Sequence, residues 1–192
     1  MITGAGGFIG GHLIADLRMQ GYGNIVAVDR KPLTEWYQRF FDIDNRVLDL
    51  QLLENCRAAV QGCDIVYNLA ADMGGMGFIE NNKALCMLSV LINTHMLQAS
   101  QEVGVSRFFY SSSACVYAAD KQTFVENPGL KEADAYPAMP EDGYGWEKLF
   151  SERLFLSFMR NKGIEVRIAR YHNIFGPFGT WTGGREKAPA AF

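Results

Sequence analysis

The sequence has little net charge and no long apolar run, and each shortage excludes a class of protein. A formal net charge of −3 over 192 residues leaves no broad basic surface to neutralise phosphate backbones, so we expect no nucleic-acid partner. The longest apolar stretch, about residues 84–92, is far shorter than the roughly 20 residues of a membrane-spanning helix, so we expect no membrane segment. The start lacks the basic region of a secretory signal. A small-molecule substrate fits this composition better.

Metal ligands and disulfide pairs are equally scarce. The four cysteines, Cys56, Cys63, Cys86 and Cys115, have no metal-ligand spacing, and three stand in apolar surroundings typical of buried thiols. The three histidines show no metal spacing either. We therefore expect no metal site and a reduced, cytoplasmic location.

Short apolar runs and helical patterns alternate along the chain, and 48% hydrophobic residues are enough for one buried core. Strand-like runs occur at about residues 2–3, 24–28, 46–48, 65–69, 107–110 and 166–169. Helical patterns lie between them, at 7–20, 52–60, 78–103 and 144–161. This alternation predicts an α/β, Rossmann-like, doubly wound parallel sheet with helices on both faces. Residues 118–142 are expected to form an exposed loop.

A glycine-rich turn follows the first strand, in Thr3-Gly4-Ala5-Gly6-Gly7-Phe8-Ile9-Gly10. Glycines at this spacing allow a tight turn and a close approach of backbone to a pyrophosphate at the next helix N-terminus. Asp29 closes the next strand, where a carboxylate accepts the ribose hydroxyls and repels a 2′-phosphate, which favours NAD over NADP. Arg30 and Lys31 beside it weaken that choice, and an ordinary glycine turn remains the simpler alternative. Asp49 could reach the adenine, although a helix cap explains it as well.

A second motif, Tyr144-Gly145-Trp146-Glu147-Lys148, places Tyr144 and Lys148 on one face of a helix. A nearby cation favours the phenolate, so we expect the lysine to lower the tyrosine pKa and make it a proton acceptor. A packed ring and a solvated amine are the ordinary alternative. The run Tyr-Ser-Ser-Ser-Ala-Cys-Val-Tyr at 110–117 supports the catalytic interpretation, because it could place a hydroxyl beside Tyr144.

Together with the Asn-Leu-Ala-Ala strand end at 68–71, these motifs resemble the extended short-chain dehydrogenase/reductases, a family of NAD-dependent epimerases and dehydratases. Further segments are similar to the branch of that family that inverts GDP-mannose at two carbons. They are Ala-Asp-Met-Gly-Gly-Met-Gly-Phe at 71–78, Ser-Ala-Cys at 113–115, Tyr-His-Asn-Ile-Phe-Gly-Pro at 171–177 and Gly-Gly-Arg-Glu-Lys-Ala-Pro at 183–189.

The resemblance implies a mechanism and a set of site residues. Tyr144, with Lys148 and Ser113, would remove the proton of the sugar 4-hydroxyl while hydride passes to NAD⁺, and Cys115 and Lys187 would serve as base and acid at C3 and C5. GDP-mannose would then give GDP-L-galactose and GDP-L-gulose, a supply of ascorbate precursors. The implied cofactor-binding residues are Gly4, Gly7, Phe8, Ile9, Gly10, Asp29, Asp49, Leu69, Tyr144 and Lys148. The implied substrate-binding residues are Gly74, Ser113, Ala114, Cys115, Asn173, Glu186, Lys187 and Ala188.

The family chain is longer than this one, and its first strand is here reduced to about residues 1–3. We therefore assign residues 1–170 to the NAD-binding domain and 171–192 to the start of a largely missing substrate-binding region. We expect the 192 residues alone to fold poorly and to turn over the GDP-sugar weakly or not at all. The resemblance also implies a homodimer through the helices at 78–103 and 144–161. Two other functions stay open, a sugar-nucleotide 4-epimerase or 4,6-dehydratase and a non-catalytic NAD-binding module.

Overall fold

The fold is built on a parallel sheet. The computed structural model describes residues 1–74, 76–123, 125–182 and 189. Within them the strands are β1 (Ile2–Thr3), β2 (Val26–Asp29), β3 (Asp44–Val47), β4 (Ile65–Asn68), β5 (Arg107–Ser113) and β6 (Glu165–Tyr171). They lie in the order β3-β2-β1-β4-β5-β6, and every neighbouring pair is parallel. The predicted doubly wound sheet is confirmed.

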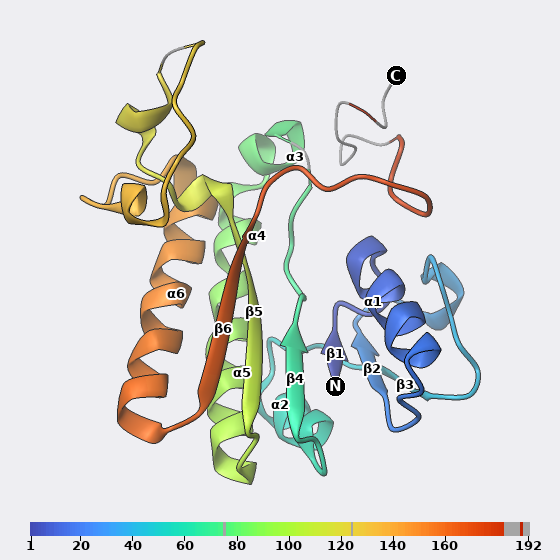
Figure 1. Cartoon of the computed structure of the whole chain (residues 1–192). Helices are drawn as coiled ribbons and strands as arrows, with labels where there is room; N and C mark the ends of the chain where they lie inside the picture. The colour runs from blue at the N-terminus through green and yellow to red at the C-terminus, as the bar shows by residue number, and fades with distance from the viewer. Residues whose placement is uncertain (75, 124, 183–188, 190–192) are drawn as a thin grey trace.

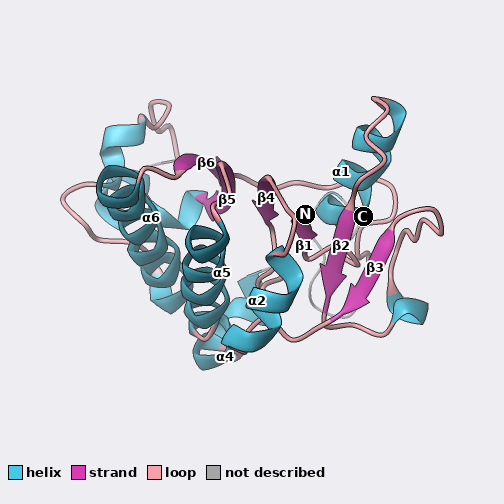
Figure 2. Cartoon of the chain, turned by 90° about the horizontal axis from the view of Figure 1, so that it is seen from below, coloured by secondary structure: helices cyan, strands magenta, loops and turns pink. Residues whose placement is uncertain are grey.

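Helices cover both faces of the sheet (Figures 1 and 2). Helix α1 (Phe8–Met19) lies on one face, and α2 (Leu53–Val60), α5 (Ser89–Val103) and α6 (Asp142–Lys162) lie on the other. Short 3-10 turns are η1 (Leu33–Glu35), η2 (Ala114–Val116), η3 (Ala119–Gln122) and η4 (Glu132–Ala135). The last two lie in the segment that we expected to be an irregular loop.

The single helix predicted at 78–103 is instead divided into α3 (Met76–Asn81), α4 (Lys83–Met87) and α5. Two asparagines mark the first break. The Asn81 side chain donates to the carbonyl oxygen of Gly77 at 2.7 Å, and that of Asn82 donates to Phe78 at 2.9 Å. Asparagine side chains compete with the backbone in this way and disfavour a continuous helix. Hydrophobic periodicity alone did not carry that signal.

The apolar core has a part on each face of the sheet. On the face that α6 covers, Tyr110 and Phe108 of β5 pack on Phe155 of α6. The ring centroid of Phe155 lies 4.6 Å from that of Tyr110 and 4.9 Å from that of Phe108. On the other face, Ile2 of β1 packs beneath α1 with Ile14. Although β1 has two residues, it is paired on both sides and buried. Alternate side chains of the strands therefore enter opposite parts of the core.

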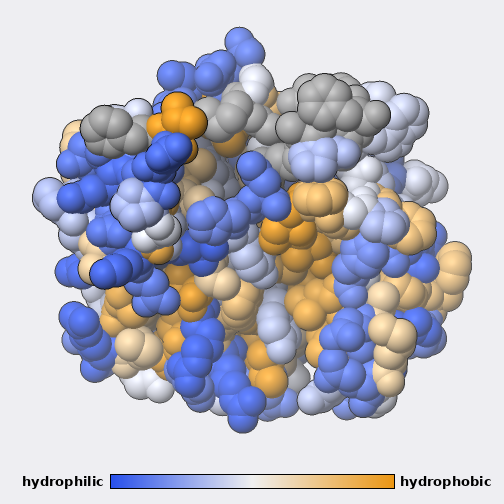
Figure 3. All heavy atoms as spheres, turned by 45° about the horizontal axis from the view of Figure 1, so that its top comes forward, coloured by the Kyte–Doolittle hydropathy of each residue, from blue (hydrophilic) through white to orange (hydrophobic). Residues whose placement is uncertain are grey.

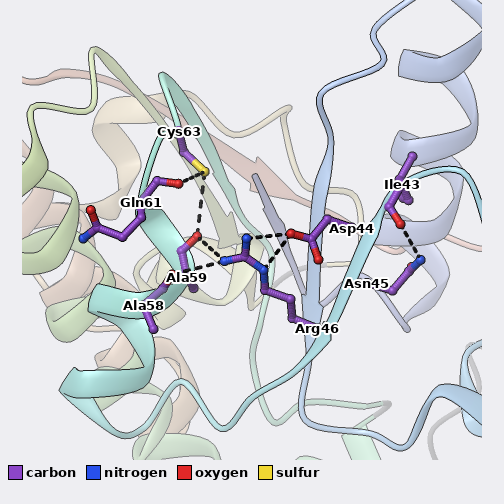
Figure 4. A network of polar contacts seen from close by, with 8 residues as sticks. All are labelled: Ile43, Asp44, Asn45, Arg46, Ala58, Ala59, Gln61 and Cys63. Atoms are coloured by element: carbon purple, nitrogen blue, oxygen red, sulfur yellow. Dashed lines mark hydrogen bonds and ion pairs between the residues drawn. The ribbon is translucent and has the colours of Figure 1, made fainter.

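A polar network ties the edge strand β3 to α2 at the amino end of the sheet (Figure 4). Arg46 donates to the Asp44 carboxylate at 2.6 and 2.9 Å, and to the carbonyl of Ala58 at 3.1 Å. Its guanidinium thus satisfies a carbonyl in the last turn of α2, where a cation also complements the helix dipole. The Cys63 thiol lies 3.8 Å from the Ala59 carbonyl in the same network. Arg46 thus links β3 to the end of α2 and stabilises this edge of the fold.

After β6 the chain leaves the sheet and crosses its carboxyl edge toward α1 (Figure 1). The His12 side chain of α1 is hydrogen-bonded to the Pro177 carbonyl at 2.8 Å, and the Tyr37 hydroxyl to Thr180 at 2.7 Å.

None of the described helices could cross a membrane, and the described residues include no group of His, Cys, Asp or Glu fit to hold a metal ion.

Candidate active site

The candidate site lies at the carboxyl edge of the sheet, where the strand order reverses between β1 and β4. The glycine turn follows β1, Asp29 ends β2, Leu69 follows β4 and Ser113 ends β5. Ligands of open α/β sheets bind at this point because the loops diverge there. Figure 3, with this edge turned toward the viewer, shows apolar side chains reaching the surface among polar ones. The fold thus brings the residues of both motifs to one edge.

The glycine turn leaves room for no side chain at its closest contacts. Gly4 has φ +66°, and a Cβ there would lie 3.0 Å from the backbone nitrogen of Ala70. A Cβ on Gly10 would lie 2.3 Å from the Gly4 carbonyl oxygen, so α1 begins directly against the turn. The N-cap residue Gly7 makes no side-chain cap, and the first turn of α1 contains no acidic residue. These features fit the pyrophosphate of a dinucleotide, which the helix dipole and the backbone amides at the start of α1 would hold.

The hydroxyl of Thr3 holds the glycine turn against the end of β4. It accepts hydrogen bonds from the backbone nitrogens of Leu69 and Ala70, each at 3.0 Å, and donates to the Asn68 side chain at 2.8 Å. Thr3 is fully buried. Sequence reasoning treated this residue only as the start of the motif, because its partners lie far away along the chain.

Asp29 occupies the position expected of the ribose-binding carboxylate. It accepts hydrogen bonds from the backbone nitrogens of Gly6 and Lys31, both at 3.0 Å, so its orientation is set by the glycine turn itself. Asp49 is exposed and accepts from the backbone nitrogen of Gln51 at 3.0 Å, in the turn that precedes α2. Its contact with adenine remains a prediction.

Tyr144 and Lys148 share the buried face of α6, with 3% and 2% of each residue exposed. The Lys148 Nζ donates to the Ser111 carbonyl at 3.0 Å and lies 5.6 Å from the centre of the Tyr144 ring. A Cβ on Gly145 would lie 2.3 Å from the carbonyl oxygen of Cys115. Glycine after the tyrosine therefore lets α6 pack directly on η2.

Burial controls the ionisation of this pair. It raises the pKa of Tyr144 well above its ordinary value, the charges of Cys115 and Glu147 raise it further, and a hydrogen bond with Ser113 opposes them. Burial also lowers the pKa of Lys148, against the attraction of Glu147. This is opposite to the lowered tyrosine pKa that we expected, because removing water from around the phenolate is the largest effect on Tyr144.

Cys115 lies close to the tyrosine. It belongs to η2, directly after β5, and its backbone nitrogen donates to the Ser113 hydroxyl at 3.2 Å. Its half-buried side chain packs against an apolar cluster that contains Ile79, Cys86 and Tyr144. The structure thus brings Ser113, Cys115 and Tyr144 together, as the resemblance implied.

The other predicted residues are placed less completely. Ala114 lies in η2, and Gly74 is buried in the segment between β4 and α3. Asn173 is exposed just after β6, on the same edge of the sheet. Glu186, Lys187 and Ala188 lie outside the described residues. The roles assigned to these residues remain predictions.

Sequence reasoning missed the buried carboxyl of Glu147, which lies beside Lys148 on α6. Oε1 of Glu147 accepts hydrogen bonds from Asn93 at 2.6 Å and from Ser151 at 2.9 Å. Asn68 donates to Asn93 at 2.8 Å, so this chain of contacts continues to the glycine turn. Glu147 and Ser151 are four residues apart and so share one face of the helix. This spacing of two polar residues on a buried helix could have indicated their hydrogen bond.

A parallel sheet in this order, with a glycine turn at the reversal and a buried tyrosine and lysine on one helix, defines a dinucleotide-binding protein of the epimerase and dehydratase type. A model of the NAD dependent epimerase/dehydratase family matches residues 1–191, and the chain belongs to that family.

Its relatives agree with this assignment. The chain is 49% identical over 192 residues to GDP-mannose 3,5-epimerase of Arabidopsis thaliana, and 50% identical to GDP-mannose 3,5-epimerase 1 of Oryza sativa subsp. japonica. All of this chain is aligned in both cases, against 51% and 50% of theirs, so it spans about half the length of these curated relatives. The Thermus thermophilus UDP-glucose 4-epimerase complex with NAD shares the fold, with a TM-score of 0.81, 21% identity, and coverage of 95% of this chain and 57% of that one.

Proposed function

We propose that the protein carrying this chain inverts GDP-mannose at C3 and C5, giving GDP-L-galactose and GDP-L-gulose through a transient 4-ketone. The observation that carries the proposal is the placement of Cys115 beside Tyr144, two residues after Ser113. A tyrosine with a lysine suits reversible oxidation at C4, while an additional thiol next to it suits proton removal from a carbon beside a ketone. The 49–50% identity to two GDP-mannose 3,5-epimerases supports this substrate.

The proposed reaction begins and ends with Tyr144. Its oxygen takes the proton of the sugar 4-hydroxyl and later returns it, with Ser113 hydrogen-bonded to the tyrosine. The glycine turn and Asp29 would hold NAD⁺, which would supply the hydride acceptor for C4. Burial raises the pKa of Tyr144, and a cation beside its hydroxyl acts in the opposite direction because it favours the phenolate. Lys148, fixed by the Ser111 carbonyl, supplies such a cation.

Inversion at C3 and C5 needs one group on each side of the sugar ring. While C4 is a ketone, the hydrogens on the neighbouring carbons become acidic, and Cys115 removes one as the base. The matching acid is Lys187, whose role rests on the family resemblance. Reduction of the ketone at C4 by the same hydride would then leave the sugar with no net oxidation.

We further propose that the enzyme is a cytoplasmic homodimer. Apolar side chains remain exposed at the start of α5 and along α6, where a second copy would cover them: Leu88, Leu91, Trp146 and Phe150. Pairing of these two helices with their symmetry mates would form a four-helix bundle. Unpaired thiols such as Cys56, buried in the core, suit a reducing compartment.

The decisive experiment is incubation of the natural full-length protein with GDP-mannose in deuterated water, followed by location of the label by NMR. We expect deuterium at C3 and C5, and label at neither position would contradict the proposal. The Cys115→Ala variant should lose the label, whereas intact turnover would favour a 4-epimerase or a 4,6-dehydratase, the latter releasing a 4-keto-6-deoxy sugar. The Tyr144→Phe variant should lose about 10²-fold or more in turnover. No change on that substitution would favour a non-catalytic NAD-binding module.

A further inference from the structure

A two-bonded ion pair crosses the carboxyl end of β1. Arg30, directly after β2, donates through Nη1 to Oδ2 of Asp72 at 3.0 Å and through Nη2 to Oδ1. Asp72 lies in the segment after β4, and β2 and β4 are the two neighbours of β1. The pair therefore joins the loops on either side of the glycine turn.

The two partners differ in how firmly they are held. The Asp72 side chain is 5% exposed, and its backbone nitrogen donates at 3.1 Å to the hydroxyl of Ser89, which is fully buried. The Arg30 side chain is 48% exposed on a flexible stem. Asp72 is thus the fixed anchor, and the direction in which the guanidinium points depends on it.

The other charges beside the ribose position are also engaged. Asp29 accepts hydrogen bonds from Gly6 and Lys31 and faces the glycine turn. The Nζ of Lys31 lies 4.8 Å from the centre of the Tyr37 ring, as a cation above an aromatic face. Both cations that follow Asp29 therefore have partners away from its carboxylate.

This arrangement bears on the choice between NAD and NADP. An arginine next to the ribose-binding position is the residue that accommodates the 2′-phosphate of NADP. A guanidinium can bind either a carboxylate or a phosphate through two hydrogen bonds, but it cannot serve both with the same pair of donors. Arg30 has the chemistry and the chain position for a 2′-phosphate, and its two-bonded contact with Asp72 occupies it.

We propose that Asp72 is a specificity-determining residue: by holding Arg30, it withholds from the 2′-phosphate of NADP the cation that would otherwise bind it. Asp72 acts through Arg30 and is a positioning residue. The inference rests on the proposed use of NAD and extends it, because it assigns part of the preference to a residue in the segment after β4, remote in the chain from Asp29.

The test is the Asp72→Asn variant, which keeps the size of the side chain and removes its charge. Dissociation constants of NAD⁺ and NADP⁺ are measured by titration calorimetry for this variant and the unchanged protein. We expect the ratio of NADP⁺ to NAD⁺ affinity to rise about tenfold, the size of one charge-assisted contact. Because Asp29 stays in place, NAD⁺ should remain the tighter ligand. Asp72→Ser gives the same readout if the asparagine variant folds poorly.

Two further variants separate this role from a merely structural one. Adding Arg30→Ala to Asp72→Asn should abolish the gain, since the freed cation is then absent. Asp42→Asn removes the partner of Arg18 in an exposed ion pair and should leave the ratio unchanged. If Asp72→Asn weakens the binding of NAD⁺ and NADP⁺ equally, or leaves the ratio of their affinities unchanged, this inference is overturned and the proposed function is not. If the unchanged protein binds neither dinucleotide, the proposed function fails with it.

Discussion

Replacement of Glu147 by glutamine should change the free energy of unfolding in a pH-dependent way. Relative to the unchanged chain, the variant should be more stable at pH 8 than it is at pH 4. Only 4% of Glu147 is exposed. Its Oε1 accepts from Asn93 and Ser151, whereas Oε2 is buried without a hydrogen-bond partner among the described residues. Burial raises the pKa of Glu147, opposed by the charge of Lys148 and by the two hydrogen bonds. A buried oxygen without a donor makes the ionised form costly.

The direction of this pH dependence follows from which state, folded or unfolded, holds the proton of Glu147. In an unfolded chain a glutamate loses its proton near pH ~4.3, whereas the folded chain keeps it up to its raised pKa. Between those two values the folded state holds more protons, so the free energy of unfolding falls as pH rises. Each pH unit between the two pKa values corresponds to about 1.4 kcal/mol. The titratable groups that interact with this carboxyl, Lys148 and Tyr144 on α6 and Tyr110 on β5, are present in both proteins. The difference between the two pH curves therefore reports Glu147 together with its effect on these groups.

Glutamine keeps the Oε1 acceptor for Asn93 and Ser151 and cannot ionise. Urea unfolding at pH 4 and pH 8 should therefore show a difference in the free energy of unfolding between Glu147→Gln and the unchanged protein that grows toward pH 8. Glu147→Ala should instead lose about 2–4 kcal/mol at both pH values, because it leaves a cavity and unmatched polar groups. Glu126→Gln, in an exposed loop, serves as the control. Parallel pH curves for the glutamine variant and the unchanged protein would refute the reasoning.

Two further predictions concern packing and thiol reactivity. Gly145→Ala should lower the free energy of unfolding by about 1–3 kcal/mol in urea, because the new Cβ would meet the Cys115 carbonyl oxygen at 2.3 Å. Gly129→Ala, with open space around it, should change it by less than about 0.5 kcal/mol, and equal effects would count against the packing argument. Burial raises the pKa of Cys56 to about 12, and its thiol donates to the Leu50 carbonyl at 3.1 Å. Mass spectrometry should find Cys56 unmodified by iodoacetamide at pH 8 until urea is added, and rapid labelling of the native protein would contradict its burial.

Much of the fold could be predicted from the sequence because its signals are local. The alternation of apolar runs and helical patterns identified each strand and most helices to within a few residues. Tyr144 and Lys148 were placed on one helix face by their spacing alone, and the structure confirms that they share its buried side. The division of α3, α4 and α5 was missed, since it depends on the side chains of Asn81 and Asn82 and on no change in periodicity.

The electrostatics of the candidate site could not be predicted in the same way. The pKa of Tyr144 rises, where the sequence suggested a fall, because its burial depends on α6 packing against η2 and α4. The contact of Arg30 with Asp72 joins residues 42 positions apart, and no motif contains both. Such contacts exist only after the sheet has brought the two loops together.

The class of the fold, the glycine turn and the candidate reactive side chains follow from local sequence, because backbone preference and hydrophobic spacing act over a few residues. Which groups are buried, which of them hold protons and which partner each charge has depend on the tertiary structure. Those properties depend on desolvation and on distances between segments remote in the chain. Thr3 is an example of both. The sequence places it at the start of the glycine turn, and the fold brings its hydroxyl to the backbone nitrogens of Leu69 and Ala70 at the end of the neighbouring strand β4.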